Sequence, residues 1–179
     1  MLKNTQNSYG MVAKLFHWIV SILILSLIAV GFYMTSLESS PEKGELYTMH
    51  KSFGVLVLSI IVLRIMWKIS NKAVLPIANV SILFSLGAKV THFLLYVFIL
   101  IMPLSGIMMS RFNGYDISVF GLFTIPGLLK NEAYAGNFHT IHVTAIWGLL
   151  ALIILHILGA FYHHFIRKDK TLLRMIKDV

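Results

Sequence analysis

Apolar residues are gathered into four long runs separated by more polar segments. The runs extend approximately over residues 16–37, 53–69, 86–110 and 141–166. A helix needs about 20 mainly apolar residues to cross the hydrocarbon core of a bilayer, and each run is close to that length. The connections are short except for residues 111–138. The pattern therefore predicts an all-α, integral membrane four-helix bundle that forms one domain over residues 1–179.

Composition agrees with lipid as the main solvent of this chain. Hydrophobic residues make up 58% of the positions and charged residues 12%, and the mean hydropathy is +0.82. The first apolar run is too long for the core of a cleavable signal peptide and lacks a small-residue cleavage site. We therefore expect this run to remain as a membrane anchor.

The distribution of basic residues predicts the orientation, because Lys and Arg accumulate on the cytoplasmic side of short loops. With the N-terminus inside, the inner side holds most of them: Lys3, Lys14, Arg64, Lys68, Lys72, Lys89, Arg167, Lys168, Lys170, Arg174 and Lys177. The outer side holds Lys43, Lys51, Arg111 and Lys130. Both termini are therefore predicted to be cytoplasmic. The net charge of +8 flanks apolar runs instead of forming one stripe, so we expect no nucleic-acid binding.

Histidines within the apolar runs are the main candidates for chemistry. His142 and His156 lie fourteen residues apart, which places them on one helix face with an axial separation of about 21 Å. Ionisable residues in a membrane helix are costly and usually face a bundle interior where something binds them. His50 begins the second span on the outer side, and His17 begins the first on the inner side. Depth therefore pairs His50 with His142 and His17 with His156.

Haem is the cofactor that best fits two such pairs. Two neutral imidazoles can hold one iron axially while an apolar bundle surrounds the macrocycle. The chain has no cysteine, so any haem is b-type, and we expect two haems b that work by outer-sphere electron transfer. Zinc or copper fits less well, because a structural zinc site gathers four ligands at one depth. A metal or proton carrier that uses the histidines is a further alternative.

Two inner residues have more than one interpretation. His92 enters the third run from the inner side, where it either replaces one of the inner ligands or serves another molecule. Arg64 lies fourteen residues after His50 on the same helix face. Its guanidinium either meets the propionates of an inner haem or extends to the cytoplasmic interface.

The remaining histidines are expected near the two surfaces. His139, which directly follows the long connection of residues 111–138, is expected to belong to the outer loop, and this partly apolar loop is expected to fold back as a lid over the outer haem. His163 and His164 lie at the cytoplasmic end of the fourth run, where interfacial polarity alone explains them.

Several motifs resemble those of a known family. They are Phe16-His17-Trp18, Met49-His50 followed by Gly54 and Arg64, Thr91-His92 with Tyr96 and Pro103, His142, Leu155-His156, and the segment from His163 to Met175. With them the chain resembles the bacterial cytochrome b561 family of four-helix dihaem membrane proteins, particularly the branch described as superoxide oxidase. The last motif is the most specific, because its order and its distance from His156 match that branch.

The resemblance implies roles for named residues. His17 and His156 would bind the iron of the inner haem, and His50 and His142 that of the outer haem. Quinone would bind near the cytoplasmic end, where His163, His92 and Lys89 are candidate contacts. The expected location is the bacterial inner membrane, as a multi-pass protein.

The resemblance also implies that superoxide outside reduces the outer haem, and that the electron passes through the inner haem to ubiquinone. Lys51, next to His50, is a candidate guide for superoxide. The rival functions are a respiratory electron shuttle and a membrane-anchor cytochrome b subunit that exchanges electrons between quinol and a partner dehydrogenase. Outside that last case, no protein partner is required.

Overall fold

The computed structural model describes residues 1–77 and 80–177, which are mainly helical. Four of the described helices are long and apolar enough to cross a membrane: α1 (Met11–Ser36), α2 (Pro41–Ser70), α3 (Ile82–Phe112) and α4 (Glu132–Phe161). A π-helical turn, η1 (Tyr162–Ile166), extends α4, and the short helix α5 (Leu173–Ile176) follows it. The predicted four-helix membrane bundle is confirmed.

The helices begin several residues before the apolar runs from which they were predicted, because polar capping residues set their first turns. The Ser40 hydroxyl accepts a hydrogen bond from the Lys43 N–H (3.2 Å), and Pro41 occupies the first turn of α2. The Asn131 side chain accepts one from the Tyr134 N–H (3.1 Å), so α4 begins at Glu132. The prediction that His139 lies in the outer loop is therefore wrong, because this cap brings it into α4.

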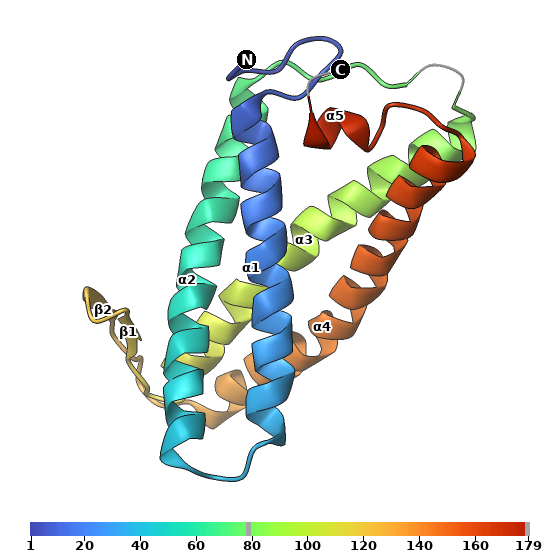
Figure 1. Cartoon of the computed structure of the whole chain (residues 1–179). Helices are drawn as coiled ribbons and strands as arrows, with labels where there is room; N and C mark the ends of the chain where they lie inside the picture. The colour runs from blue at the N-terminus through green and yellow to red at the C-terminus, as the bar shows by residue number, and fades with distance from the viewer. Residues whose placement is uncertain (78–79, 178–179) are drawn as a thin grey trace.

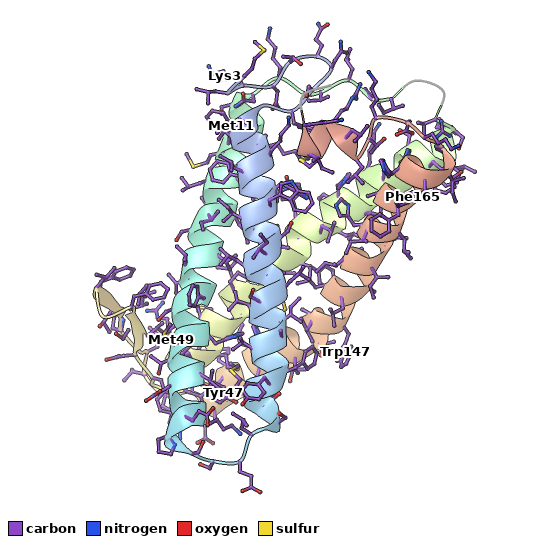
Figure 2. The ribbon with its side chains drawn as sticks, viewed as in Figure 1. Lys3, Met11, Tyr47, Met49, Trp147 and Phe165 are labelled. Carbon is purple, nitrogen blue, oxygen red and sulfur yellow. The ribbon has the colours of Figure 1, made fainter. Side chains whose placement is uncertain are left out.

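The helices are arranged as two pairs. α1 packs mainly against α2, and α3 packs mainly against α4. The second pair leans away from the first toward the end that carries both termini, and α5 lies in the space that opens between α1 and α4 (Figure 1). We call the end of the bundle that carries Lys3 and both termini the terminal end. The opposite end, near Tyr47, is the hairpin end (Figure 2).

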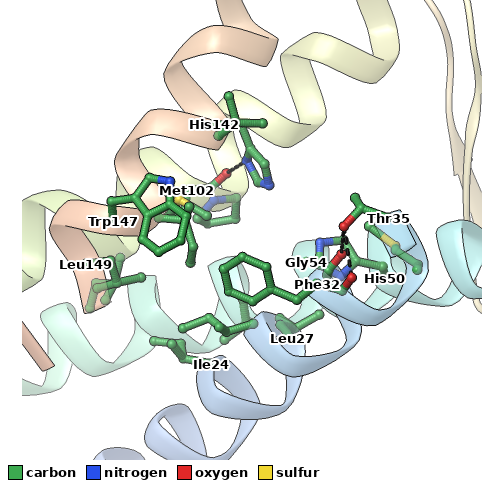
Figure 3. Close-up of a pocket in the computed structure, with 18 residues that line it drawn as sticks. Ile24, Leu27, Phe32, Thr35, His50, Gly54, Met102, His142, Trp147 and Leu149 are labelled. Atoms are coloured by element: carbon green, nitrogen blue, oxygen red, sulfur yellow. Dashed lines mark hydrogen bonds between the residues drawn. The ribbon is translucent and has the colours of Figure 1, made fainter. Parts of the chain in front are cut away.

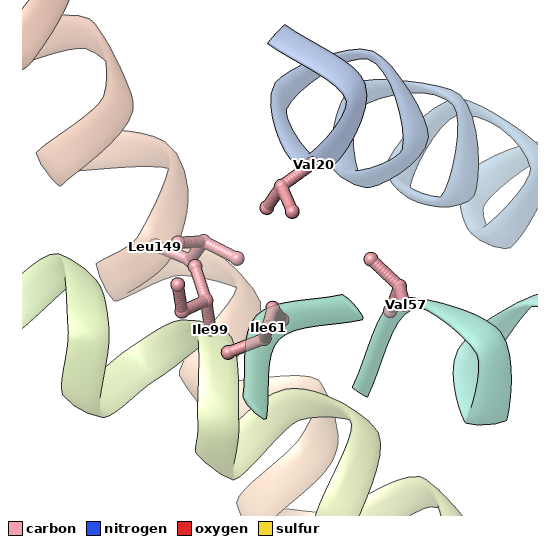
Figure 4. Close-up of a cluster of buried hydrophobic side chains, with 5 residues drawn as sticks. All are labelled: Val20, Val57, Ile61, Ile99 and Leu149. Atoms are coloured by element: carbon pink, nitrogen blue, oxygen red, sulfur yellow. The ribbon is translucent and has the colours of Figure 1, made fainter. Parts of the chain in front are cut away.

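A small apolar core joins the four helices at mid-height. Its buried side chains are Val20, Val57, Ile61, Ile99 and Leu149, contributed by all four helices (Figure 4). The other apolar side chains on the helices are mostly exposed or half-buried, as they are in a protein surrounded by lipid. Leu149 lies halfway along α4 between His142 and His156, so the core separates the space around one histidine from the space around the other.

Three chain segments close the terminal end. They are residues 1–10, 72–77 and 167–177, which we call the terminal cap. The Leu75 N–H donates to the Gln6 carbonyl (2.8 Å), and Arg174 Nη1 donates to the Leu75 carbonyl (2.8 Å). The Trp18 indole N–H donates to the Met175 carbonyl (3.0 Å), which fastens α5 to α1. The cap therefore depends on contacts between segments distant in sequence.

A β-hairpin occupies part of the connection between α3 and α4. Its strands β1 (Ile117–Val119) and β2 (Phe123–Ile125) are antiparallel, with Ser118 opposite Thr124. The Ser52 hydroxyl on α2 donates to the Ser118 carbonyl (2.8 Å) and accepts from the Phe120 N–H (3.3 Å). These bonds hold the hairpin against the flank of α2. It does not line the cavity beside His50, so the expected lid is not present there.

Candidate functional site

His50 on α2 and His142 on α4 face one another near the hairpin end. Their ring centroids are 6.5 Å apart, and the ring planes are nearly perpendicular at 83°. Both rings line a cavity of about 340 Å³ whose other walls are almost entirely apolar, including Leu27, Phe32 and Trp147 (Figure 3). An apolar cavity with two convergent imidazoles is suited to a flat, largely hydrophobic cofactor.

The orientation of His142 is set by α3. Its Nδ1 lies 2.9 Å from the Met102 carbonyl and 3.1 Å from the Ser105 hydroxyl. Because a carbonyl only accepts, Nδ1 carries the proton and Nε2 keeps its lone pair free for a metal. Gly106 makes room for this ring, since a Cβ at that position would lie 3.1 Å from His142 Cε1. The sequence did not distinguish this close approach from ordinary helix packing.

His50 presents an unusual nitrogen. Its Nδ1 is buried and has no hydrogen-bond partner within residues 1–77 and 80–177. Buried polar atoms are nearly always paired, so an orphaned imidazole nitrogen in an apolar wall marks a place where a ligand is accommodated. This atom fits the two-imidazole site independently of the distance between the rings.

Three histidines gather near the terminal end. The centroids of His17 on α1 and His156 on α4 are 6.1 Å apart, and those of His92 on α3 and His156 are 5.2 Å apart. The His17 ring also lies 5.2 Å from that of Trp18, the residue that fastens α5. The structure therefore brings His17, His92 and His156 together, as their depths predicted.

The ring separations discriminate among these pairs. Two imidazoles that bind one metal ion from opposite sides, each about 2 Å from it, have ring centres about 6 Å apart. The separations of 6.5 Å for His50 with His142 and 6.1 Å for His17 with His156 fit this geometry. At 5.2 Å, His92 is closer to His156 than an intervening ion allows without displacement of a ring. Within the described chain, no three His or acidic side chains converge as metal ligands.

Cations and aromatic rings surround the three histidines. Arg64 Nη2 lies 3.0 Å from His17 Nδ1, and the Arg64 guanidinium carbon is 5.7 Å from the centre of the Tyr96 ring. Lys68 Nζ lies over the same ring at 4.2 Å. Arg64 therefore reaches the bundle interior beside His17, where the sequence had left its position open.

A second polar cluster lies where η1 meets the terminal cap. His163 Nδ1 is 2.6 Å from one oxygen of Asp169, and Arg167 Nε is 3.3 Å from the same oxygen. Thr171 donates its backbone N–H (2.9 Å) and its hydroxyl to the other oxygen. Burial raises the pKa of Asp169, but the hydrogen bonds from Thr171 and His163 outweigh it and bring the pKa to about 2.

This carboxylate orients His163. Asp169 fixes the Nδ1 side of the ring, and Nε2 has no hydrogen-bond partner in the part of the chain that the structure describes. The π-helical turn and the left-handed backbone at Lys168 (φ 54°) produce the bend that brings Asp169 back onto His163. The sequence analysis singled out His163 without its partner.

Other predicted residues are not gathered with these groups. Lys89 is exposed on α3, and no hydrogen bond within the described residues joins it to His92 or His163. Lys51 lies beside the hairpin-end pair, with Nζ 5.3 Å from the centre of the Tyr115 ring. Sequence reasoning missed Trp18 and Ser105 as supports of the histidines. A Trp directly after a candidate ligand was the only available signal.

Comparison with known proteins identifies the family. Residues 8–178 match the family model described as prokaryotic cytochrome b561. The chain is 32% identical to cytochrome b561 homolog 2 of Escherichia coli (strain K12), over 97% of this chain and 93% of that protein. It is 35% identical to cytochrome b561 homolog 1 of the same organism, over 50% of this chain and 51% of that protein.

A third relative is more distant. A Yersinia pestis protein named probable superoxide oxidase CybB is 26% identical over 89% of this chain and 90% of that protein. The match of the family model across nearly the whole chain agrees with the four apolar helices. This chain belongs to the prokaryotic cytochrome b561 family, whose members are membrane electron-transfer proteins that bind haem b.

Proposed function

We propose that the protein is a two-haem cytochrome b that transfers electrons from superoxide at the outer face of the bacterial inner membrane to ubiquinone. One observation carries the two-haem part of the proposal. Two pairs of histidines on facing helices lie at opposite ends of the apolar core, each with rings about 6 Å apart, at 6.5 Å and 6.1 Å. This is the separation that one iron between two imidazoles requires.

In this proposal His50 and His142 would hold the iron of an outer haem, and His17 and His156 would hold that of an inner haem. Bound there, haem would supply one-electron redox chemistry, and two imidazoles on one iron would favour electron transfer over oxygen binding. The chain orients the rings, as the Met102 carbonyl does for His142, and surrounds them with apolar side chains that exclude water. Electrons are therefore passed without binding of oxygen to iron.

The orientation follows from the basic residues. Eleven of the fifteen lie on the side of the termini and the α2–α3 connection, which supports a cytoplasmic position for the terminal end. The hairpin end then faces outward, and His50 and His142 belong to the outer site. Residues 1–179 act as one four-helix unit in this proposal.

Superoxide is proposed as the donor because of the similarity to the Yersinia pestis protein named probable superoxide oxidase. At the hairpin end, Lys51 next to His50 offers a local positive charge for a small anion. The outer segments also carry five acids against four basic residues, so no broad positive surface is involved. Attraction of superoxide is local to Lys51.

Ubiquinone is proposed as the acceptor at the terminal end. His163 is the principal contact, because Asp169 holds its Nδ1 side and leaves Nε2 available to a quinone oxygen. His92 and Lys89 are further candidate contacts. Two superoxide anions each lose one electron to become oxygen. One ubiquinone takes up those two electrons and two cytoplasmic protons to become ubiquinol.

A second candidate function has its own support. The relative named cytochrome b561 homolog 2 is more similar to this chain, at 32%, than the relative named for superoxide, at 26%. Its name gives no donor. A respiratory electron shuttle, or a membrane-anchor subunit that exchanges electrons between quinol and a partner dehydrogenase, uses the same two histidine pairs. Such an anchor subunit requires a protein partner, whereas the superoxide reaction does not.

Rapid mixing with superoxide separates these functions. We expect a pulse of superoxide to reduce the haem of the purified protein much faster than that of the His50→Ala variant, which lacks the outer haem. The His139→Ala variant is the matched control, because His139 is exposed on α4 and belongs to neither pair. Wild-type reduction no faster than in His50→Ala, together with rapid reduction by quinol, would support the shuttle instead.

A further inference from the structure

The terminal end collects positive charge with few carboxylates to balance it. Within the described residues, neither Arg64 nor Arg174 has an ion-pair partner. Of the chain's acids, Glu38, Glu42, Glu45, Asp116 and Glu132 lie toward the hairpin end. Asp169 is occupied by His163 and Arg167, and Asp178 lies outside the described residues. Partly buried guanidinium groups at a membrane protein's interior need a compensating anion.

Arg64 contacts His17, and Arg174 lies in a distant segment that is fastened to the next residue, Trp18. Arg64 contacts the His17 ring directly, with Nη2 3.0 Å from Nδ1. Arg174 precedes Met175, whose carbonyl accepts the indole N–H of Trp18 at 3.0 Å. Because Trp18 follows His17, this bond fastens α5, which carries Arg174, to the part of α1 where His17 lies.

Unpaired donors gather in the same region. Arg174 Nη1 is used by the Leu75 carbonyl, but its Nε is buried without a hydrogen-bond partner among the described residues. Trp67 Nε1, about one turn beyond Arg64 on α2, and the Ser8 hydroxyl in the terminal cap are buried and unpaired in the same way. Arginine can bind a carboxylate through two parallel hydrogen bonds, and the edge of the guanidinium that carries Nε is one of the edges suited to this.

Tyr9 adds a further polar group under the cap. Burial raises the pKa of its hydroxyl, and Tyr96 adds to this, whereas Arg174 and Arg64 oppose it. Tyr9 is therefore close enough to both arginines for their charges to act on it. The hydroxyl therefore stays protonated at neutral pH and remains a hydrogen-bond donor.

The contact between Arg64 and His17 changes when the ring binds a metal. A neutral imidazole that binds iron through Nε2 carries its proton on Nδ1, so it can no longer accept a hydrogen bond from Arg64. Ligation therefore releases the Arg64 guanidinium from His17. A negatively charged group beside the ring is then its natural partner.

We propose that Arg64 and Arg174 form a clamp for the propionate carboxylates of the inner haem, and that the terminal cap serves to bring Arg174 to this position. The inference rests on the proposed function, since it requires a haem between His17 and His156. A lipid phosphate offers similar chemistry. The propionates are favoured because Arg64 contacts His17, α5 is fastened to Trp18, and the unpaired Nε of Arg174 is buried.

The first test uses the His142→Ala background, which leaves only the inner site. Adding Arg174→Gln should weaken haem affinity about 10- to 100-fold, as expected for loss of a charge-assisted hydrogen bond, and should lower the midpoint potential of the haem that remains. Lys170→Gln removes an exposed positive charge from the same segment and should change neither quantity. Unchanged affinity and potential in both Arg174→Gln and Arg64→Gln would overturn the clamp.

A second test changes the propionates of the haem. Haem dimethyl ester, in which both propionates are esterified, should bind the His142→Ala protein about 10- to 100-fold more weakly than haem, and Arg174→Gln should remove most of that difference. Equal affinity for haem and its ester overturns the proposal. If Arg174→Gln instead weakens only the binding to phosphatidylglycerol vesicles, the site belongs to lipid. A background protein that binds no haem contradicts the proposed histidine pairing itself.

Discussion

At the scale of single residues, the sequence predicted which histidines meet but not what orients them. The depths of His17, His50, His142 and His156 along apolar runs determine their pairing, because each run crosses the membrane once. The partners of these rings depend on which helix faces touch, and no short-range pattern encodes that. The Met102 carbonyl behind His142 illustrates this, since its role requires α3 and α4 to pack at one rotation.

Asp169 provides a residue-scale prediction about pH. Its pKa of about 2 lies below the ordinary value of 3.8, so its carboxylate stabilises the folded cap at every pH above about 4. This stabilisation is lost as the pH falls from about 4 toward 2. We expect Trp18 fluorescence, measured with Trp67 and Trp147 replaced by Phe, to report loosening of the cap in that window.

The matched variants give this prediction a clear outcome. Asp169→Asn should loosen the cap already at neutral pH and lack the transition between pH 4 and 2. Asp116→Asn, which alters a carboxylate at the hairpin end, should keep the wild-type transition. An identical acid transition in wild type and Asp169→Asn would show that another group controls the cap.

At the scale of elements, long apolar runs predicted the helices, and short polar motifs set their ends. The four spans were recognised because a run of about 20 consecutive, mainly apolar residues is typical of a membrane-spanning helix. The β-hairpin was not recognised, because strands of three residues carry no measurable alternation. The position of the hairpin depends on Ser52, a small polar residue in α2. Its hydrogen-bond partners in the hairpin lie more than sixty positions away in sequence.

Ser52 yields the element-scale prediction. Ser52→Ala leaves the Ser118 carbonyl and the Phe120 N–H without their α2 partner, at a cost of about 1–3 kcal/mol to hairpin docking. Hydrogen exchange of residues 117–125 should therefore accelerate by about tenfold or more. Ser59→Ala is the matched control, since Ser59 bonds only to its own helix at Val55. Equal exchange in the two variants would mean that Ser52 does not hold the hairpin.

At the scale of the whole molecule, the bundle and its family were accessible from sequence, whereas the terminal cap was not. Hydropathy and the histidine depths describe the four helices and two sites. The cap is built from hydrogen bonds between residues 1–10, 72–77 and 167–177, such as those of Leu75 with Gln6 and with Arg174. Such bonds leave no periodic signature, yet together with the Trp18 bond they hold α5 at the terminal end of the bundle.

Haem stoichiometry tests the central claim most directly. Pyridine haemochrome analysis should give two haems b per chain for the wild type, about one each for His142→Ala and His156→Ala, and two for the His139→Ala control. In His142→Ala, the remaining haem should be the one held by His17 and His156. A wild type with fewer than two haems, or full occupancy in both ligand variants, would contradict the pairing of histidines across the bundle.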